Sequence, residues 1–324
     1  MWQPTGSLTT LHVRAALMRQ VREFFWARDV EEVETPLLGL TPVTDPYLET
    51  FTVEGLGETR YLQTSPEYAM KRLLAAGSGS IYQLGKAFRK EESGRQHLPE
   101  FTMLEWYHLD FTDLDLMNEV DDLLQLLLKT PKAARISYQD AFLKVLNLDP
   151  HQASLESLVQ HVTEKIGEIP GLFSPDPEIY RDVCLQLLMS DCVERALMQA
   201  YHDRPVMVYE YPASQAALAQ IKKTGTLSST ISVAARFEVF YQGMELGNGY
   251  FELQDVSAQR ARFQGDLKRR AAMGLQPVPT DTRLLEAMAF GLPSCAGIAM
   301  GFDRLVMLAV GAQNIEEVVA FGKN

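Results

Sequence analysis

The segment from Lys86 to Tyr107 constrains the fold most, because its side chains repeat at the two-residue period of a β-strand on both sides of a polar loop. Arg89 and Glu91 are two residues apart, so on a strand they point to one face. After the loop, one face carries Phe101, Met103, Glu105 and Tyr107. A guanidinium grips phosphate or carboxylate, a glutamate accepts from an amine, and an aromatic ring stacks on a base. We predict a β-hairpin with a polar face suited to nucleotide chemistry; a surface hairpin with a salt bridge is the alternative.

The same segment closely resembles motif 2 of class II aminoacyl-tRNA synthetases, especially the lysyl branch. There, Phe-Arg-x-Glu is followed by a loop and by Pro-Glu-Phe-Thr, as in residues 88–91 and 99–102 here. The resemblance implies an α+β fold with an antiparallel β-sheet flanked by helices, in a single catalytic domain over residues 1–324. It also implies that ATP is a co-substrate.

The composition and net charge of the chain limit the classes of partner and the compartment that we expect. The chain has 324 residues, is 46% hydrophobic and has a formal net charge of −12, which disfavours broad binding to a phosphate backbone and hence a tRNA partner. Its three cysteines are too few for a disulfide framework, which favours a reducing cytoplasm. No segment resembles a signal peptide or a membrane span, so neither secretion nor membrane insertion is expected.

The N-terminal region predicts a helix and then a strand. Apolar residues at helical spacing indicate an amphipathic helix over about residues 9–28, and residues 30–36 read as a strand ending in Pro36. This order resembles motif 1, which implies a homodimer. Residues 130–205 are rich in proline between short helical pieces, and we interpret them as a helical insertion in the catalytic domain.

The segment Thr64-Ser65-Pro66-Glu67 predicts a helix start. Pro66 suits the first helical turn, with Ser65 as the cap. A capped helix start is the plain interpretation. The same four residues line the amino-acid pocket in the lysyl-type family, and the resemblance implies that Glu67 receives the amine at the substrate's reactive end.

Residues 236–247 predict a second hairpin around a two-residue turn at Gln242-Gly243. This register pairs Phe240 with Glu245, and Glu238 with Gly247, so the two carboxylates lie diagonally on one face, about 7 Å apart. Two carboxylates without histidine suit Mg²⁺ that also contacts ATP phosphates. A pair of exposed acids is the alternative.

The stretch that follows, Glu-Leu-Gly-Asn-Gly-Tyr-Phe-Glu-Leu from residue 245, resembles the lysyl-type signature. The resemblance implies that Glu252 receives the ammonium of the lysine side chain, assisted by the hydroxyl of Tyr107. It also implies that Asn248 helps to hold the substrate carboxylate.

Residues 297–304, Gly-Ile-Ala-Met-Gly-Phe-Asp-Arg, predict a strand that meets a helix capped by Asp303, with Arg304 in the first turn. A tight strand-helix packing is the alternative. The segment resembles motif 3, in which such an arginine contacts ATP and covers the adenine. The resemblance implies catalytic roles for Arg89 and Arg304, and ATP contacts at Arg89, Lys90, Glu91, His97, Leu98, Phe101, Glu245, Leu246, Gly301 and Arg304.

The chain looks like the truncated lysyl-type paralogues that attach (R)-β-lysine to a lysine ε-amine of translation elongation factor P. We expect no N-terminal anticodon-binding barrel, because the motif 1 helix begins within about ten residues of Met1. The motif 2 loop has Arg95 one position earlier than in the tRNA enzymes. Motif 3 has Ala299 where they usually have glycine, which suggests a role in choosing β- over α-lysine. Leu98 departs from both groups, which usually have asparagine. The alternatives are a lysyl-tRNA synthetase-like enzyme that charges tRNA and a non-catalytic regulatory subunit.

Overall fold

The computed structural model describes residues 2–55, 57–90, 93–169, 173–174, 176–226 and 229–322. The chain divides into two compact units, which are described separately below. The first comprises Met1–Lys129 and Glu252–Asn324, and the second comprises Thr130–Phe251. Both contain helices and strands, as the predicted α+β class requires.

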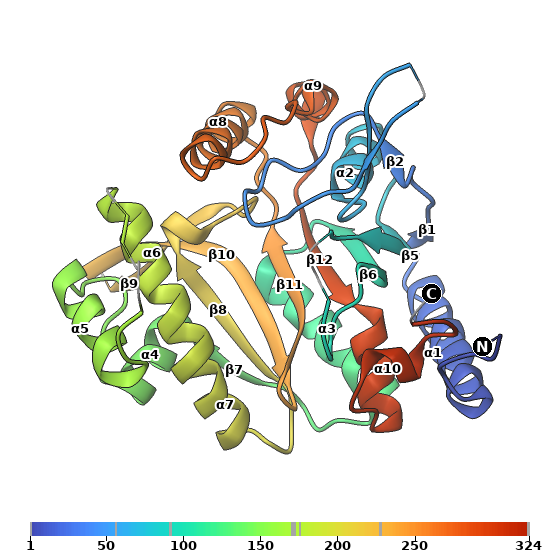
Figure 1. Ribbon diagram of the computed structural model, residues 1–324, viewed down its shortest axis with the longest axis horizontal. Coiled ribbons are helices and arrows are strands. Elements are labelled where there is room, and N and C mark those ends of the chain that lie inside the picture. The colour runs from blue at the N-terminus through green and yellow to red at the C-terminus, as the bar shows by residue number, and fades with distance from the viewer. Residues whose placement is uncertain are drawn as a thin grey trace. The chain divides into compact units, whose positions relative to one another are not determined.

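The first unit is built on a sheet in the order β1-β5-β6-β12 (Figure 1). Its strands are β1 (Glu31–Glu32), β5 (Ile81–Phe88), β6 (Glu100–Leu109) and β12 (Cys295–Gly301). β5, β6 and β12 are antiparallel neighbours, whereas β1 pairs with β5 in parallel. The predicted motif 2 hairpin is therefore confirmed, and the strand predicted over residues 30–36 is reduced to two residues. A small second sheet contains β2 (Leu38–Gly39), β4 (Arg60–Leu62) and β3 (Thr52–Val53).

Six helices of the first unit are α1 (Leu8–Trp26), α2 (Glu67–Ala75), α3 (Asp113–Leu128), α8 (Val256–Ala272), α9 (Thr282–Gly291) and α10 (Phe302–Val310). A short 3₁₀ helix, η3 (Ile315–Val318), follows α10. Ser7 caps α1 by accepting from the backbone N–H of Thr10, so the N-terminal helix predicted from apolar spacing is confirmed. In the described part of the chain, no helix is long and apolar enough to cross a membrane.

The two faces of the main sheet differ in polarity. On one face, Phe25 of α1 stacks on Tyr82 with ring centroids 4.4 Å apart, and it meets Trp106 edge-on at 5.2 Å. Leu104, Trp106 and Met300 are fully buried there. The opposite face carries the alternate residues of the same strands, including Glu105 and Tyr107. Strand periodicity thus separates an apolar core face from a charged face.

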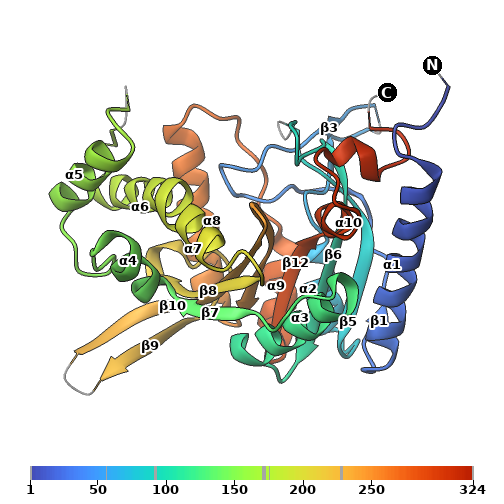
Figure 2. The ribbon, with the colours of Figure 1, turned by 90° about the horizontal axis from the view of Figure 1, so that it is seen from below.

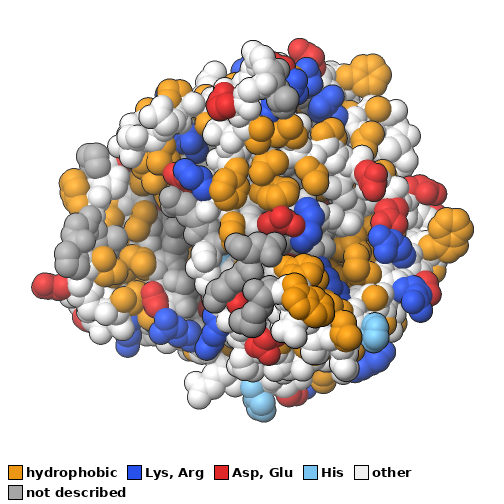
Figure 3. Space-filling view, turned by 45° about the vertical axis from the view of Figure 1, so that its right-hand side comes forward, with side chains coloured by type: hydrophobic (Ala, Val, Ile, Leu, Met, Phe, Trp, Pro, Cys, Tyr) orange, Lys and Arg blue, Asp and Glu red, His pale blue; other side chains and the backbone are white. Residues whose placement is uncertain are grey.

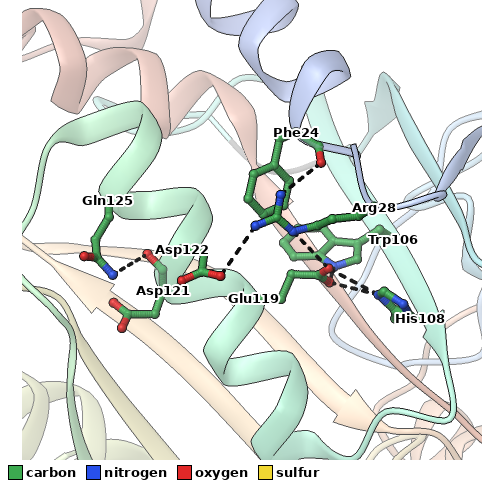
Figure 4. A network of polar contacts seen from close by, with 8 residues as sticks. All are labelled: Phe24, Arg28, Trp106, His108, Glu119, Asp121, Asp122 and Gln125. Atoms are coloured by element: carbon green, nitrogen blue, oxygen red, sulfur yellow. Dashed lines mark hydrogen bonds and ion pairs between the residues drawn. The ribbon is translucent and has the colours of Figure 1, made fainter. Parts of the chain in front are cut away.

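A buried carboxylate joins three elements beneath the core face (Figure 4). Glu119 of α3 accepts from Trp106 Nε1 at 2.9 Å, lies 3.2 Å from His108 Nδ1, and forms an ion pair with Arg28 Nε at 3.7 Å. The Arg28 guanidinium also stacks on Phe24, 3.6 Å from the ring centroid. The carboxylate therefore ties α3 to β6 and to the end of α1.

The second unit has the strand order β7-β8-β10-β11, with β9 paired to β10. Its strands are β7 (Ala134–Ser137), β8 (Val206–Pro212), β9 (Ile221–Thr226), β10 (Ser229–Tyr241) and β11 (Met244–Phe251). Its helical segments are α4 (Tyr138–Leu146), α5 (Leu155–Lys165), α6 (Pro177–Leu188), the π-helix η1 (Met189–Val193), α7 (Glu194–Ala200) and the 3₁₀ helix η2 (Ala213–Gln215). α6 and α7 lie over β8 and β10 (Figure 2). The region predicted as a helical insertion thus contains α4 to α7 and also β7.

The β10–β11 hairpin confirms the predicted turn but not the predicted register. Gln242 and Gly243 both have positive φ, 46° and 79°, as a two-residue hairpin turn of this kind requires. Phe240 pairs with Glu245 as expected. A β-bulge follows, so Glu238 pairs with Asn248 and not with Gly247. The prediction was wrong because strand alternation alone does not reveal an extra residue in one strand.

We expect Glu119→Ala to destabilise the protein by about 2 to 3 kcal/mol, because it leaves the buried Trp106 N–H without its acceptor. Urea unfolding measures this change. Asp122→Ala is the matched control: Asp122 contacts the same Arg28 at 3.5 Å, but its side chain is 60% exposed. We expect it to change the stability by no more than about 0.5 kcal/mol. Equal losses in the two variants would contradict the assigned role of Glu119.

Candidate active site

The charged face of the first unit's sheet carries a cluster of acidic side chains beside small residues, and this cluster is called the pocket below. Glu105 on β6 lies between Gln83 and Ala299, and Tyr107 lies between Ile81 and Gly297. The next row along is Gly85, Met103 and Gly301. Because directly opposed residues share a face, Ala299 lies beside the Glu105 carboxylate on this face. The glycines on this face let neighbouring side chains lie against the sheet, since a Cβ at Gly85 would lie 3.2 Å from Gln83 Nε2 and one at Gly301 would lie 3.4 Å from Arg304 Cδ.

Gly297 is required by the side chains packed against it. A Cβ at this position would lie 2.3 Å from the Tyr107 ring and 2.9 Å from Glu252 Oε1. No side chain larger than hydrogen fits without moving both groups. Gly297 therefore allows the Tyr107 ring and the Glu252 carboxylate to approach the strand together.

Three carboxylates and one ammonium meet in this pocket. Lys71 Nζ lies 2.6 Å from Glu67 Oε1 and 2.6 Å from Glu252 Oε2. The Tyr107 hydroxyl donates to Glu105 Oε1 at 2.6 Å. The other oxygen of Glu105 is buried and accepts no hydrogen bond from the described residues. Since Glu105 is only 2% exposed, that oxygen is a buried acceptor.

Burial dominates the protonation of these groups. It raises the pKa of Glu105, and the negative charge of Glu67 adds to the effect. It also raises the pKa of Glu252, although the ammonium of Lys71 opposes this shift. For Lys71, burial alone would lower the pKa, but the carboxylates of Glu252 and Glu67 outweigh it and the pKa is raised. The pocket is therefore poised to hold additional positive charge.

The predicted nucleotide contacts lie at the other end of the same face. The Arg89 guanidinium lies over the Phe101 ring, 5.2 Å from its centroid. The Arg304 guanidinium contacts His97 Nε2 and donates from Nε to the Gln96 carbonyl at 3.4 Å. These contacts form two pairs, Arg89 with Phe101 of β6 and Arg304 of α10 with His97 of the motif 2 loop.

The motif 2 loop closes through a narrow turn. Gly94 and His97 form an isolated β-bridge, which leaves Arg95 at the tip. The Arg95 carbonyl accepts from the N–H of Ile315 at 2.9 Å. Leu98 is half-buried. Glu91, a predicted ATP contact, lies outside the described residues.

The remaining nucleotide and pocket residues of the first unit are also located. Lys90 makes an ion pair with Glu49 at 3.3 Å at an exposed position. Gly301 is the last residue of β12 and directly precedes Arg304's helix. Ser65 Oγ accepts from the N–H of Glu67 at 3.4 Å, while Pro66 occupies the N-cap of α2, one residue later than predicted.

The second unit holds the predicted metal ligands on the β10–β11 hairpin. Glu238 accepts from Asn248 Nδ2 at 3.1 Å, from the Tyr211 hydroxyl at 2.6 Å and from Arg236. The bulge makes these contacts possible, because it places Asn248 opposite Glu238. Glu245, opposite Phe240, belongs to the same face as Glu238 and is exposed. Asn248 thus orients Glu238 here, a contact that strand periodicity did not predict, and Leu246 is buried at the bulge.

The donor set of this hairpin fits Mg²⁺. Glu238 and Glu245 supply oxygen only, and Mg²⁺ is usually bound through one or two carboxylates together with substrate phosphates. Within the described ranges, no group of three or more Asp, Glu, His or Cys side chains could hold a metal by itself. Nearby, burial raises the pKa of Glu194 to about 8, with Glu238 and Glu245 adding to the effect.

Sequence reasoning missed two members of the pocket, Glu105 and Lys71. The period-two pattern placed Glu105 on the same face as Tyr107, and that position could have identified it. Lys71 follows Glu67 by four residues, the spacing of neighbours on one face of a helix. A lysine four residues after a glutamate usually forms an ion pair with it at the protein surface. Only the structure, in which Lys71 is 2% exposed, reveals that it belongs to the pocket.

A family model described as class II tRNA synthetases (D, K and N) matches residues 5–324. The chain belongs to this family. It is also similar over 99% of its length to proteins named elongation factor P–(R)-β-lysine ligase. The match is 49% identical for the protein from Photobacterium profundum and 49% for that from Vibrio cholerae, each covered over 97% of its own length. For the protein from Haemophilus ducreyi it is 48%, over 96% of that protein. The family predicted from the motifs is confirmed.

We expect Glu105→Gln to gain stability relative to the wild type as pH rises from 5 to 8. Burial raises the pKa of Glu105, so the folded protein keeps a proton there that the unfolded chain releases above about pH 4.3. Ionisation inside the fold opposes folding, and glutamine removes this penalty. The relative gain is on the order of 1 kcal/mol or more.

Urea unfolding at several pH values measures this difference. Glu100→Gln, on the same strand with a side chain that is 57% exposed, is the control and should show almost no pH-dependent difference. A constant difference between Glu105→Gln and the wild type across this range would contradict the assigned protonation.

Proposed function

We propose that this protein is an ATP-dependent ligase that activates (R)-β-lysine as an aminoacyl-adenylate and transfers it to a lysine ε-amine of translation elongation factor P. The observation that carries the proposal is the cluster of half-buried Glu67 with buried Glu105 and Glu252 within a class II synthetase chain. Its surplus of negative charge suits a substrate with two ammonium groups. The names of the relatives supply the acceptor protein.

In the proposed first step, a carboxylate oxygen of the amino acid attacks the α-phosphorus of ATP, and the bond to pyrophosphate breaks. Arg89 neutralises charge that develops on the phosphate oxygens, while Arg304 and Phe101 hold the adenine. His97 lies beside Arg304 and is assigned to the γ-phosphate end, with Lys90, Glu91, Leu98, Leu246 and Gly301 as further ATP contacts. Glu238 and Glu245 would hold Mg²⁺, which would supply charge neutralisation for the phosphates when bound.

In the proposed second step, the acceptor amine attacks the carbonyl carbon of the adenylate. A C–N amide bond forms, the C–O bond to AMP breaks, and the amine loses a proton. The amino acid is held through its two ammonium groups by the carboxylates of the pocket, with Ser65 and Pro66 fixing the start of α2 and Asn248 assigned to the carboxylate end. No nucleophile from this chain takes part.

The acceptor is proposed to be a protein because the charge of the chain disfavours tRNA. The net charge is −12, and on the face drawn in Figure 3 acidic and basic side chains are interspersed. Extended binding to a tRNA backbone requires clustered basic residues. We further propose a cytoplasmic homodimer formed through α1 and β1, the elements that resemble motif 1.

The direct test is intact-mass spectrometry of elongation factor P after incubation with this protein, Mg-ATP and (R)-β-lysine. We expect a mass increase of one lysyl group.

Arg89→Ala should lower the rate at least about 100-fold, since it removes transition-state charge stabilisation. Arg195→Ala, at a 71% exposed position on α7, should leave the rate unchanged. Labelling of bulk tRNA without modification of elongation factor P would favour tRNA charging. If neither elongation factor P nor tRNA is modified, the result would favour a regulatory subunit.

We expect Ala299→Gly to change the ratio of kcat/KM for (R)-β-lysine to that for α-lysine by at least about fivefold. The methyl group lies opposite Glu105 on the charged face of the sheet, and a steric mismatch at a packed wall is worth about 1 to 3 kcal/mol. Amino-acid-dependent pyrophosphate exchange measures both values. Ala296→Gly, on the other face of the same strand, is the control. An unchanged ratio in Ala299→Gly would exclude this position from the choice of substrate.

A further inference from the structure

Lys71 has an unusual position for a lysine. It lies in the middle of α2, one helical turn after Glu67, and its side chain is only 3% exposed. Its ammonium lies 2.6 Å from one oxygen of Glu67 and 2.6 Å from one oxygen of Glu252. Glu67 and Glu252 come from segments almost 190 residues apart in the chain, so Lys71 links two distant parts of the pocket wall.

Stability alone does not account for a lysine at this position. Burial of an ammonium and two carboxylates removes their hydration, and a well-packed apolar side chain of similar volume is often at least as stabilising. Met70, the neighbouring residue on the same helix, is fully buried and apolar. The ammonium of Lys71 therefore has to be explained by what it does to the carboxylates.

The charge balance gives that explanation. With all groups ionised, Glu67, Glu105 and Glu252 contribute three negative charges and Lys71 contributes one positive charge. The pocket then carries two negative charges, which match the two ammonium groups of a diamino acid. Lys71 forms ion pairs with Glu67 and Glu252, and the second oxygen of Glu105 accepts no hydrogen bond from the described residues.

Without Lys71, the half-buried Glu67 and the buried Glu105 and Glu252 would form a cluster that lacks its compensating ammonium. Like charges in a poorly hydrated site favour protonation, and a protonated carboxyl attracts an ammonium far less. Glu67 and Glu252 would also lose the group that fixes their orientation. The expected consequence is weaker binding of the amino acid at neutral pH and no comparable effect on ATP.

We propose that Lys71 is a positioning residue that holds the side chains of Glu67 and Glu252 in place through its two ion pairs, so that the pocket accepts the two ammonium groups of its amino acid. This inference rests on the proposed function and adds to it how the charges of the pocket are matched to the two ammonium groups of the amino acid. Lys71 does not contact the reacting atoms in this account.

Lys71→Met and Lys71→Gln test the proposal in amino-acid-dependent pyrophosphate exchange. We expect KM for (R)-β-lysine to rise at least tenfold in both variants at pH 7, with KM for ATP within twofold of the wild type. The pH profile of kcat/KM for the amino acid should move to higher pH. Lys86→Met is the matched control, because Lys86 is 42% exposed and pairs with Glu100 at the surface; its constants should not change.

A third variant separates the charge from the packing. In Lys71→Ala, added ethylammonium should restore part of the activity, and ethanol at the same concentration should not. Equal rescue by both, unchanged KM values in folded Lys71→Met and Lys71→Gln, or failure of all three variants to fold would each overturn the proposal. If the wild type itself shows no exchange with (R)-β-lysine, the proposed function fails; if the wild type is active and the Lys71 variants match it, only this inference fails.

Discussion

The two ion pairs of Lys71, to Glu67 and to Glu252, connect the parts of the first unit that form the pocket. Glu67 opens α2, and Glu252 lies just before α8. Buried ion pairs persist only where geometry and further hydrogen bonds offset the lost hydration. The sheet provides that geometry. Gly297 allows the Tyr107 ring and the Glu252 carboxylate to approach β12, and the Tyr107 hydroxyl bonds Glu105. A cluster of acids that would repel one another in isolation is thereby held in one place.

Apolar packing on the opposite face of the same sheet stabilises the first unit and offsets the cost of burying charged groups in the pocket. Alternate residues of β5 and β6 pack against α1 on the opposite face, where Phe25, Tyr82 and Trp106 are in ring contact. Apolar burial of this kind contributes most of the stability of a domain. One strand period therefore supports both tasks, because Trp106 faces the core and its neighbours Glu105 and Tyr107 face the substrate side. A side chain substituted on one face of the sheet has little direct contact with the side chains on the opposite face.

Much of this arrangement follows from local patterns in the sequence. Period-two alternation predicted the β5–β6 hairpin, the shared face of Phe101, Glu105 and Tyr107, and the turn at Gln242-Gly243, because these depend on neighbours within a few residues. The bulge beside Glu238 was not predictable, since it depends on how β11 packs and not on its alternation. Lys71 was not predictable either, because its burial depends on Glu252 far away in the chain. Resemblance to a family identified Glu252, but the partner of Glu252 became visible only in the fold.

The proposed pocket requires that the buried carboxyl group of Glu105 ionises when it meets an ammonium group of the amino acid. Burial raises the pKa of Glu105 to about 8, so this carboxyl group is largely protonated at neutral pH before binding. Calorimetric titration of the protein with (R)-β-lysine at pH 7, in buffers of different ionisation enthalpy, measures the protons exchanged on binding. We expect net proton release on binding, and we expect fewer protons to be released by Glu105→Gln than by the wild type. Binding with no proton release in any buffer would contradict this requirement.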